Sequence, residues 1–534
     1  MVLRQTHAAL QSNAAMDVLP STPATGMILV EEINTSANEL PFMTKKLVFS
    51  LLASLCFPIA ALAQSPAGQK KHDLRLENFQ LVDVETGDIR RGQLLLIDGD
   101  RIAAIVPISE RGALNAKTTI DLHGRYLIPG LWDMHVHFEG TDLIEDNALL
   151  LPVYLAYGIT AVRDAASDLA PEVLQWRAEV DRGVRLGPKI FTAGQKFEGI
   201  DSIWKGDLEV GDRKSMLEGM DKLEAMQVDF IKITDNTMEP RLFLETIKEA
   251  RKRGHLVSAH VPVGATIEQL ADAGLSSIEH ASYVLRLGYA GEAKIAAAAR
   301  SGEMSRQQAN DAYKAGFDQE LARKGYRMLA KKGVAVTPTL VGEWQLAYLK
   351  ETDHSKDSFQ HFLTRDFMSK YQWRIDRMAG ETAADREARK ARYQLTARQL
   401  PLLADAGVTL LAGSDSAALN TYVYPAQALH EELMLFQQAG LTPLQSLQAA
   451  TVNAARFMGR WQDFGSVARG KSADLVVLEQ NPLQDIRATQ SIAAVIRRGQ
   501  FLDKAKLSDL LREAEKRRAE LDRSRAGTGA GSTR

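Results

Sequence analysis

Cysteine is almost absent from this chain of 534 residues, since Cys56 is the only one. Cys56 lies in the apolar run from Leu47 to Ala61, so a mature chain without that run has no thiol. Structural disulfides and Cys-ligated metals are then excluded. Attachment of a lipid at Cys56 is disfavoured, because Leu55 before it is larger than such processing sites usually accept.

A strong charge of either sign is also lacking. The chain has 65 Lys and Arg against 67 Asp and Glu, a formal net charge of -2. Because the basic residues are scattered between acidic ones, no field concentrates nucleic acid, and we expect no nucleic-acid partner. A small molecule is the expected partner. Assembly into a homo-oligomer stays open.

One apolar run lies near the N-terminus, and it is shorter than a membrane span. Residues 43–46 are a short basic region, Leu47 to Ala61 are apolar, and Ala61-Leu62-Ala63 has the small-x-small form of a signal-peptidase site. We therefore predict a signal peptide over 43–63, cleavage near Ala63, and export to the periplasm or the medium. A stable membrane anchor is not expected, because the run is short for a bilayer span and contains Pro58. Residues 1–42 lack periodicity, and we interpret them as a non-native or disordered extension.

Both ends of the remaining chain have the composition of a small sheet. Residues 72–126 show short alternating strands and tight turns, and a matching pattern occupies 463–505. We predict that the two segments build one small β-sandwich domain. Residues 506–534 are predicted to be a charged, partly disordered tail, helical in pattern at first and disordered from Gly527 onward.

Between these ends, over 127–462, short β-rich runs alternate with helical patterns, which is typical of parallel βαβ units. Two polar helical stretches, 285–332 and 341–405, are long for connections and predict insertions that shape a substrate pocket. The fold class is therefore α/β, a (β/α)8 TIM-like barrel joined to the small β-sandwich. Candidate strands are 130–137, 158–164, 188–194, 228–234, 255–260, 276–280, 334–340 and 408–415.

Metal-competent residues fall at the predicted strand ends, where the function of such a barrel resides. The chain has only 11 histidines, and four of them, His135, His137, His260 and His280, occupy these ends. In a strand, residues two apart share a face, so His135 and His137 can hold one ion. Lys232 lies within a further predicted strand, 228–234, and Asp415 ends another, 408–415. Taken singly, each residue has a structural alternative: a buried hydrogen-bonded histidine, a lysine in an ion pair, or an aspartate capping a helix.

These residues belong to a set of motifs, which are Asp133-Met134-His135-Val136-His137, Lys232, His260, His280 and Gly413-Ser414-Asp415. Together the motifs resemble those of the amidohydrolase superfamily, in its imidazolonepropionase-like and Xaa-Pro dipeptidase (prolidase)-like branch. The resemblance spans about residues 75–505 and follows the order of the family's motifs. It implies two divalent ions, one held by His135, His137 and Asp415 and the other by His260 and His280. Lys232 would bridge them as a carboxylated lysine, because an ammonium repels a cation.

The chemistry implied is hydrolysis of an amide C–N bond, in a dipeptide or an N-acyl amino acid. Two ions sharing a water lower its pKa, with Asp415 as general base and then acid, and His280 as its catalytic partner. Nitrogen and oxygen donors favour zinc, with manganese or cobalt as alternatives. A cyclic amide, an amidine or an ester is an alternative substrate. A non-catalytic binding protein is less well supported, because the ligand set is complete.

Roles for several other residues are predicted from their type and their position. Tyr283, Arg163 and Arg286 are candidate contacts for a substrate carboxylate, although an ordinary ion pair suits either arginine equally well. Residues 465–472 match the phosphate-loop pattern, but they precede a strand instead of opening a helix, so nucleotide binding is not expected. His123 and His255 are predicted to be structural, and His354 and His361 to be solvated.

Overall fold

The computed structural model describes residues 71–314 and 316–529. All of them belong to one unit of the chain, Pro66–Arg534. The predicted extension at 1–42 and the predicted signal peptide at 43–63 lie outside the described residues. Within the described part of the chain, no helix combines the length and the apolar character needed to cross a bilayer.

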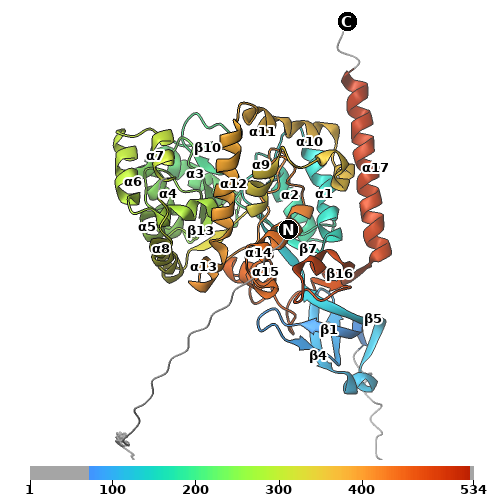
Figure 1. The fold of residues 1–534 in the computed structure, drawn as a ribbon. Coiled ribbons are helices and arrows are strands. Elements are labelled where there is room, and N and C mark those ends of the chain that lie inside the picture. The colour runs from blue at the N-terminus through green and yellow to red at the C-terminus, as the bar shows by residue number, and fades with distance from the viewer. Residues whose placement is uncertain (1–70, 315, 530–534) are drawn as a thin grey trace, which may run out of the picture. The chain divides into compact units, whose positions relative to one another are not determined.

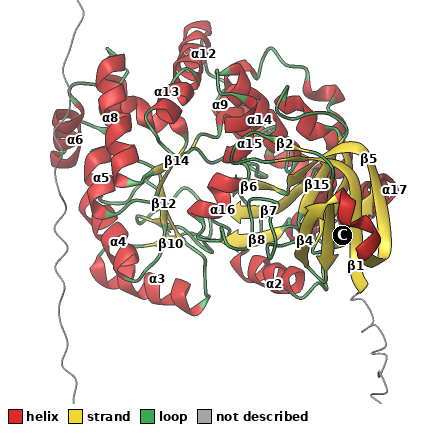
Figure 2. Ribbon diagram, turned by 90° about the horizontal axis from the view of Figure 1, so that it is seen from below, coloured by secondary structure: helices red, strands yellow, loops and turns green. Residues whose placement is uncertain are grey.

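Strands from both chain ends form one mixed sheet of eight strands (Figures 1 and 2). Strand β5 joins the two halves, because its 15 residues pair parallel with β1 and, at Tyr126–Pro129, antiparallel with β15. The order is β17-β16-β15-β5-β1-β3-β4, with β2 beside β1. The bounds are β1 Lys71–Val82, β2 Ile89–Arg90, β3 Gln93–Asp98, β4 Arg101–Pro107, β5 Asn115–Pro129, β15 Leu475–Leu478, β16 Ile492–Arg497 and β17 Gln500–Asp503; the short helix η1, Ile108–Ala113, precedes β5.

This sheet encloses its own core. Leu76, Leu95, Leu475 and Ile496 come from different strands and pack in one buried cluster. An isolated antiparallel bridge joins Arg101, at the start of β4, to residue 472, just before β15, so the sheet curls until its distant strands meet. The predicted β-sandwich is thus corrected to one continuous curled sheet, because the long strand β5 binds both halves edge to edge.

Parallel strands alternate with helices over the middle of the chain, which confirms the predicted α/β pattern (Figure 2). They form one sheet of three strands, β6-β7-β8, and another of six, β10-β9-β11-β12-β13-β14. The strands are β6 Leu131–Val136, β7 Ile159–Asp164, β8 Lys189–Thr192, β9 Phe197–Glu198, β10 Leu208–Glu209, β11 Ile231–Ile233, β12 Val257–Ala259, β13 Ser277–Glu279 and β14 Ala335–Thr337. The helices between them are α1 Ile144–Ala156, α2 Ala170–Asp181, α3 Arg213–Ala225, α4 Pro240–Lys252, α5 Ile267–Ala273 and α8 Gln319–Lys332.

The predicted eighth strand, 408–415, is not formed as a strand. Its backbone makes one parallel bridge, Leu410 with Val336 of β14, and the next residue after the segment, Ser416, makes another with Val136 of β6. Asp415 at the end of the segment is left-handed, at φ 57°, which interrupts an extended ladder. A continuous eight-stranded barrel ladder is therefore not detected among the described residues.

Both predicted insertions are helical. The first follows β13 and contains η2 Ala281–Gly288, α6 Glu292–Ser301 and α7 Arg306–Ala312. The second follows β14 and contains α9 Leu340–Tyr348, η3 His354–Lys356, η4 Ser358–Phe362, α10 Arg365–Lys370, α11 Gln372–Arg377, α12 Ala383–Ala397 and α13 Leu400–Asp405. The return to the small sheet passes through α14 Gln427–Gln438, α15 Pro443–Ala449, α16 Val452–Phe457 and η5 Ile486–Gln490.

The C-terminal segment forms a long helix, α17, Lys504–Gly529, which lies beside α1 (Figure 1). Leu507, Ala514 and Leu521 are buried along it, and Arg517 pairs with Glu145 of α1. The helix continues through 527–529, where disorder was expected. The buried apolar residues, spaced seven apart, give this charged helix a packing stripe as far as Leu521.

Candidate metal centre and its cavity

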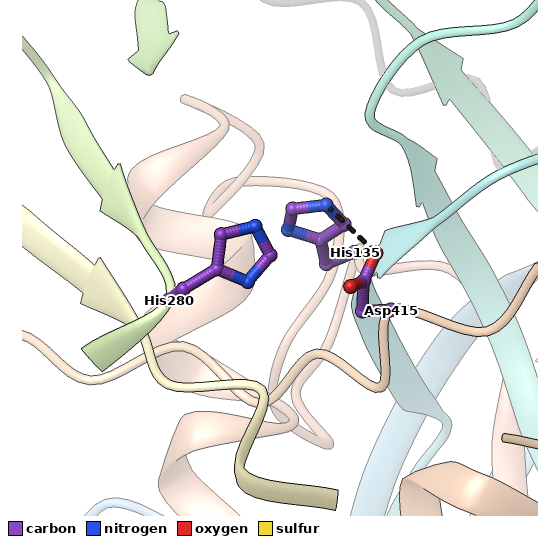
Figure 3. A group of neighbouring side chains, drawn as sticks. All are labelled: His135, His280 and Asp415. Atoms are coloured by element: carbon purple, nitrogen blue, oxygen red, sulfur yellow. Dashed lines mark ion pairs between the residues drawn. The ribbon is translucent and has the colours of Figure 1, made fainter. Parts of the chain in front are cut away.

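The structure brings the six predicted ligand residues to one end of the parallel strands. His135 lies in β6 with His137 just after it, and Lys232 is in the middle of β11. His260 and His280 directly follow β12 and β13. Because parallel strands end at one edge, residues far apart in the sequence converge there. Figure 3 shows His135 and His280 facing each other, with Asp415 beside His135.

The ligand-type atoms lie within contact distance of one another. The Nε2 atoms of His135 and His137 are 3.2 Å apart, and those of His260 and His280 are 3.1 Å apart. Asp415 Oδ1 lies 3.3 Å from His135 Nε2 and 3.2 Å from His137 Nε2. Ligand atoms of His135, His280 and Asp415 all fall within 4.8 Å of one another. One cation, or two neighbouring cations, fit among these atoms.

Each of the four imidazoles turns its Nδ1 outward to a hydrogen-bond partner. Partners of this kind fix the orientation of a metal-ligating histidine and leave Nε2 for the ion. The partners are Glu279 Oε2 for His135 at 2.7 Å, the Ala166 carbonyl for His137 at 2.8 Å, Asp235 Oδ1 for His260 at 3.2 Å and Thr339 Oγ1 for His280 at 2.7 Å. This shared orientation is what a metal centre requires.

Lys232 suits a bridging position. Its side chain is buried, and its Nζ has no hydrogen-bond partner among the described residues. Burial lowers the pKa of Lys232 to about 8. A neutral amine is the form that reacts with CO₂ to give a carbamate, and the product is an anion suited to cations. The orphaned Nζ is therefore chemically compatible with carboxylation.

Electrostatics favour neutral imidazoles at His135 and His280 and an ionised carboxylate at Asp415. Burial, followed by the charge of Lys232, lowers the pKa of His135 to about 4, and burial holds the pKa of His280 well below its usual value. The pKa of His137 is raised, because Asp415 outweighs the opposing effect of burial. The pKa of Asp415 is strongly lowered: burial alone would raise it, but the surrounding histidines dominate.

The backbone around the centre is constrained. His280, Thr339 and Asp415 adopt positive φ angles of 73°, 50° and 57°, which are costly for residues with side chains. At Gly413, a Cβ atom would lie 2.6 Å from Thr337 Cγ2 and 2.7 Å from His135 Cβ. Glycine is therefore needed where this segment passes His135.

Arg163 is enclosed by protein groups and does not line the cavity, so the structure gives no support to its predicted contact with a substrate carboxylate. The side chain is fully buried, and its Nη2 donates to both oxygens of Glu279 at 2.8 Å. Its Nε donates to the Met134 carbonyl at 2.5 Å. Glu279 in turn binds His135 Nδ1, so Arg163 and Glu279 form a buried brace beneath the centre. Burial alone would raise the pKa of Glu279, but Arg163 holds it well below its usual value.

Sequence reasoning missed Glu279, although it directly precedes His280. Its side chain points to the opposite face of the strand from its neighbour, towards the interior. An acidic residue inside a buried strand, next to a candidate ligand, was the available signal.

The other two candidate substrate residues, Tyr283 and Arg286, have different surroundings. Tyr283 lines the cavity, and its hydroxyl donates to Asp235 Oδ1 at 3.3 Å, beside His260. The Arg286 guanidinium is occupied by backbone carbonyls, with Nη1 at 2.9 Å from Pro262 O and Nη2 at 2.6 Å from Ala265 O. Arg286 thus holds the loop that follows His260, so the prediction that it binds substrate is not supported.

Two further sequence predictions can be compared with the structure. His354 is buried, at 7% exposure, and stacks on Tyr422 with 3.9 Å between ring centroids, so its predicted solvation is wrong. His361 is exposed. In the segment that matches a phosphate loop, Lys471 Nζ donates to the carbonyls of Trp461 and Phe464 at 2.5 and 2.9 Å. That lysine is engaged in holding the turn, as the strand context indicated.

A cavity of about 1390 Å³ opens over the centre. His137, Lys232, His260, His280 and Asp415 lie at its base. Residues of both helical insertions form much of its wall, among them Tyr289, Tyr313, Trp373 and Arg389. The volume is larger than the 300–1000 Å³ or so typical of small-molecule sites, so it accommodates a small organic substrate.

Comparison with known sequences identifies several relatives. The sequence pattern of the amidohydrolase family matches residues 126–502. The adenine deaminase of Desulforamulus reducens is 30% identical over 250 residues, which are 43% of this chain and 39% of that protein. The chain thus spans about two fifths of the length of that relative. Ochratoxinase of Aspergillus niger is 23% identical over 476 residues, covering 75% of this chain and 83% of the enzyme.

Solved structures share the fold at low identity. Bottromycin amidohydrolase has a TM-score of 0.65 and 23% identity, covering 83% of this chain and 90% of that one. A Xaa-Pro dipeptidase with methionine bound in its active site has a TM-score of 0.57 and 19% identity, covering 80% of this chain and 99% of that one. At these identities the likeness concerns the fold alone.

Proposed function

This chain belongs to the amidohydrolase family, and on that premise we propose that it is an exported hydrolase that cleaves an amide C–N bond of a small molecule at a centre of two divalent ions. The observation that carries the proposal is the shared orientation of four histidines, with every Nδ1 engaged and the Nε2 atoms facing one another. A set of unrelated buried histidines has no reason to adopt one orientation.

The residues divide into two ligand groups. One ion would be held by His135, His137 and Asp415, and the second by His260 and His280. Carboxylated Lys232 would contact both ions. The orphaned Lys232 Nζ and the contacts of Asp415 Oδ1 with both neighbouring histidines support this assignment. The nitrogen and oxygen donor set suits zinc.

When bound, the ions would polarise the substrate carbonyl and lower the pKa of a water molecule. The protein supplies proton transfer and orientation. Asp415 stays ionised because of the surrounding histidines, so it accepts the proton of the attacking water. It then returns the proton to the leaving nitrogen. His280 lies across from His135 (Figure 3), where it would flank the carbonyl of a bound substrate.

A dipeptide or an N-acyl amino acid is the proposed substrate class. The membership in the amidohydrolase family supports an amide, and the solved structures of the same fold include a Xaa-Pro dipeptidase. A second candidate is hydrolysis of a cyclic amide or amidine, which the 30% identity to an adenine deaminase favours over part of the chain. Hydrolysis of an ester belongs with this second candidate. A non-catalytic binding protein is a weaker candidate, because all six ligand-type residues are present.

The experiment combines metal analysis with a substrate panel. The purified protein should contain about two divalent ions per chain by elemental analysis, as the two-ion centres of hydrolases do. His135→Ala should lose metal and turnover, whereas His361→Ala, at an exposed histidine, should keep both. Full metal content and full turnover in His135→Ala would refute the proposal. Activity on lactams but not on dipeptides would favour the second candidate.

Export is proposed from the segment 43–63 alone. A chain expressed from Met43 should accumulate outside the cytoplasm with a new N-terminus at Gln64. Retention of an uncleaved chain inside the cell would contradict this part of the proposal.

A further inference from the structure

The cavity wall carries many cationic side chains, and most of them are already paired. Lys196, Arg306 and Arg389 form ion pairs with Asp207, Asp235 and Glu381. Lys205 and Arg392 form no such pair with the described residues, but both side chains are exposed. Arg374 differs from both groups.

Arg374, in α11, lines the cavity but forms no ion pair with any carboxylate of the described residues. Its guanidinium has one protein partner there, because Nη2 donates to Asn420 Oδ1 at 2.8 Å. Its Nε is buried without a hydrogen-bond partner. An arginine has five N–H donors, so this cation is poorly satisfied. Burial lowers its pKa, although the nearby charge of Asp415 opposes the shift.

The position of Arg374 ties it to the reaction centre. Asn420, which accepts from Arg374, also donates through Nδ2 to the backbone carbonyl of Asp415 at 2.6 Å. One side chain thus connects the guanidinium to the residue proposed as the general base. On the other side, the guanidinium carbon lies 5.5 Å from the centre of the Trp373 ring. Trp373 itself contacts Trp204, with 5.4 Å between ring centroids, so aromatic walls shelter the group.

We propose that Arg374 binds a carboxylate of the substrate, next to the scissile amide, with Asn420 as the residue that positions it. A guanidinium presents a planar pair of donors that matches a carboxylate, and a sheltered wall strengthens that charge-assisted bond. The inference rests on the proposed amide hydrolysis and narrows its substrate class to amides that carry an adjacent carboxylate. It assigns recognition to the second helical insertion.

The test compares matched substrates on matched variants. N-acyl amino acids and dipeptides are each paired with their C-terminal carboxamides, which lack the charge. Arg374→Met removes the guanidinium, Arg374→Lys keeps only a point charge, and Arg377→Met is the control. Arg377 lies in the same helix and over the same Trp373 ring, at 4.7 Å from its centroid, but it is exposed and does not line the cavity.

For the acids, Arg374→Met should lower kcat/KM about 10- to 100-fold, mainly through KM, as expected for loss of a charged hydrogen bond. The carboxamides should change little, Arg374→Lys should be intermediate, and Arg377→Met should resemble the wild type. Metal content and thermal unfolding of each variant show whether the centre is intact. If Arg374→Met hydrolyses the acids and its ratio of kcat/KM for the acid to kcat/KM for the carboxamide equals that of the wild type, the inference is overturned while the proposed function stands.

If the wild type hydrolyses none of the pairs, the proposed function fails for this substrate class, and the same pairs are titrated by calorimetry. Binding of the acid that is weakened in Arg374→Met and kept in Arg377→Met supports the carboxylate site on its own. No difference between acid and carboxamide with the wild type overturns it.

Discussion

The brace of Arg163 and Glu279 gives the sharpest prediction. Glu279→Gln keeps the shape of the side chain but removes its charge. Both residues are fully buried, and Glu279 accepts hydrogen bonds from Arg163 and from His135 Nδ1. An amide nitrogen in place of one oxygen cannot accept, so the variant leaves the Arg163 cation buried and uncompensated. Such losses cost about 3–5 kcal/mol of unfolding free energy.

The effect on the metal is a second, separate quantity. Loss of the partner that orients a ligating histidine lowers metal affinity by about 10- to 100-fold. Urea unfolding of the metal-free protein isolates the contribution of the ion pair, and titration of metal into the folded variant isolates the orientation of His135. The control is Glu479→Gln, whose pair with Arg125 is 38% and 32% exposed and should contribute about 0–1 kcal/mol. A Glu279→Gln protein as stable as the control, with unchanged metal affinity, would refute the brace.

Two more predictions concern stability away from the cavity. Burial lowers the pKa of His430 to about 4, so the folded state resists protonating it, and this contribution to stability is present above about pH 6.5 and lost as the pH falls towards 4. Between about pH 7.5 and pH 5, the wild type should therefore lose about 2 kcal/mol more unfolding free energy than His430→Gln; equal losses in urea titrations would contradict the assignment. Leu521→Ala should lower the unfolding free energy by about 2–5 kcal/mol, because Leu521 is 5% exposed on the packed face of α17. A melting temperature within error of the exposed control Arg523→Ala would show that α17 does not pack on the body of the protein.

The centre was accessible from the sequence because its ligands obey a local rule. His135, His260 and His280 each follow an apolar β-rich run, and the ends of parallel strands converge. No local rule places Arg163, whose partner Glu279 lies 116 positions away. Arg374 was equally hidden, because its relation to Asp415 depends on how a long insertion folds back over the cavity.

The fold, like the metal centre, was predictable from local sequence patterns only in part. Alternation of β-rich and helical patterns predicted the α/β class and most of the strands. The curl of the small sheet was not predictable, because it depends on which edges β5 offers and not on the pattern within each strand. The segment 408–415 reads as a strand by composition, but its close passage past His135 and the left-handed Asp415 prevent a regular ladder.

Strand β5 has a consequence for how the protein is made. The residues of β5 that pair with β15 are synthesised about 350 positions before their partners. Until residues 475–497 are synthesised, this part of β5 is an open edge of apolar residues, a template for pairing with other chains. Contacts of such long range also slow folding. We therefore expect a nascent or C-terminally truncated chain to need a chaperone or to aggregate through β5, even though every residue of the metal centre has already been made.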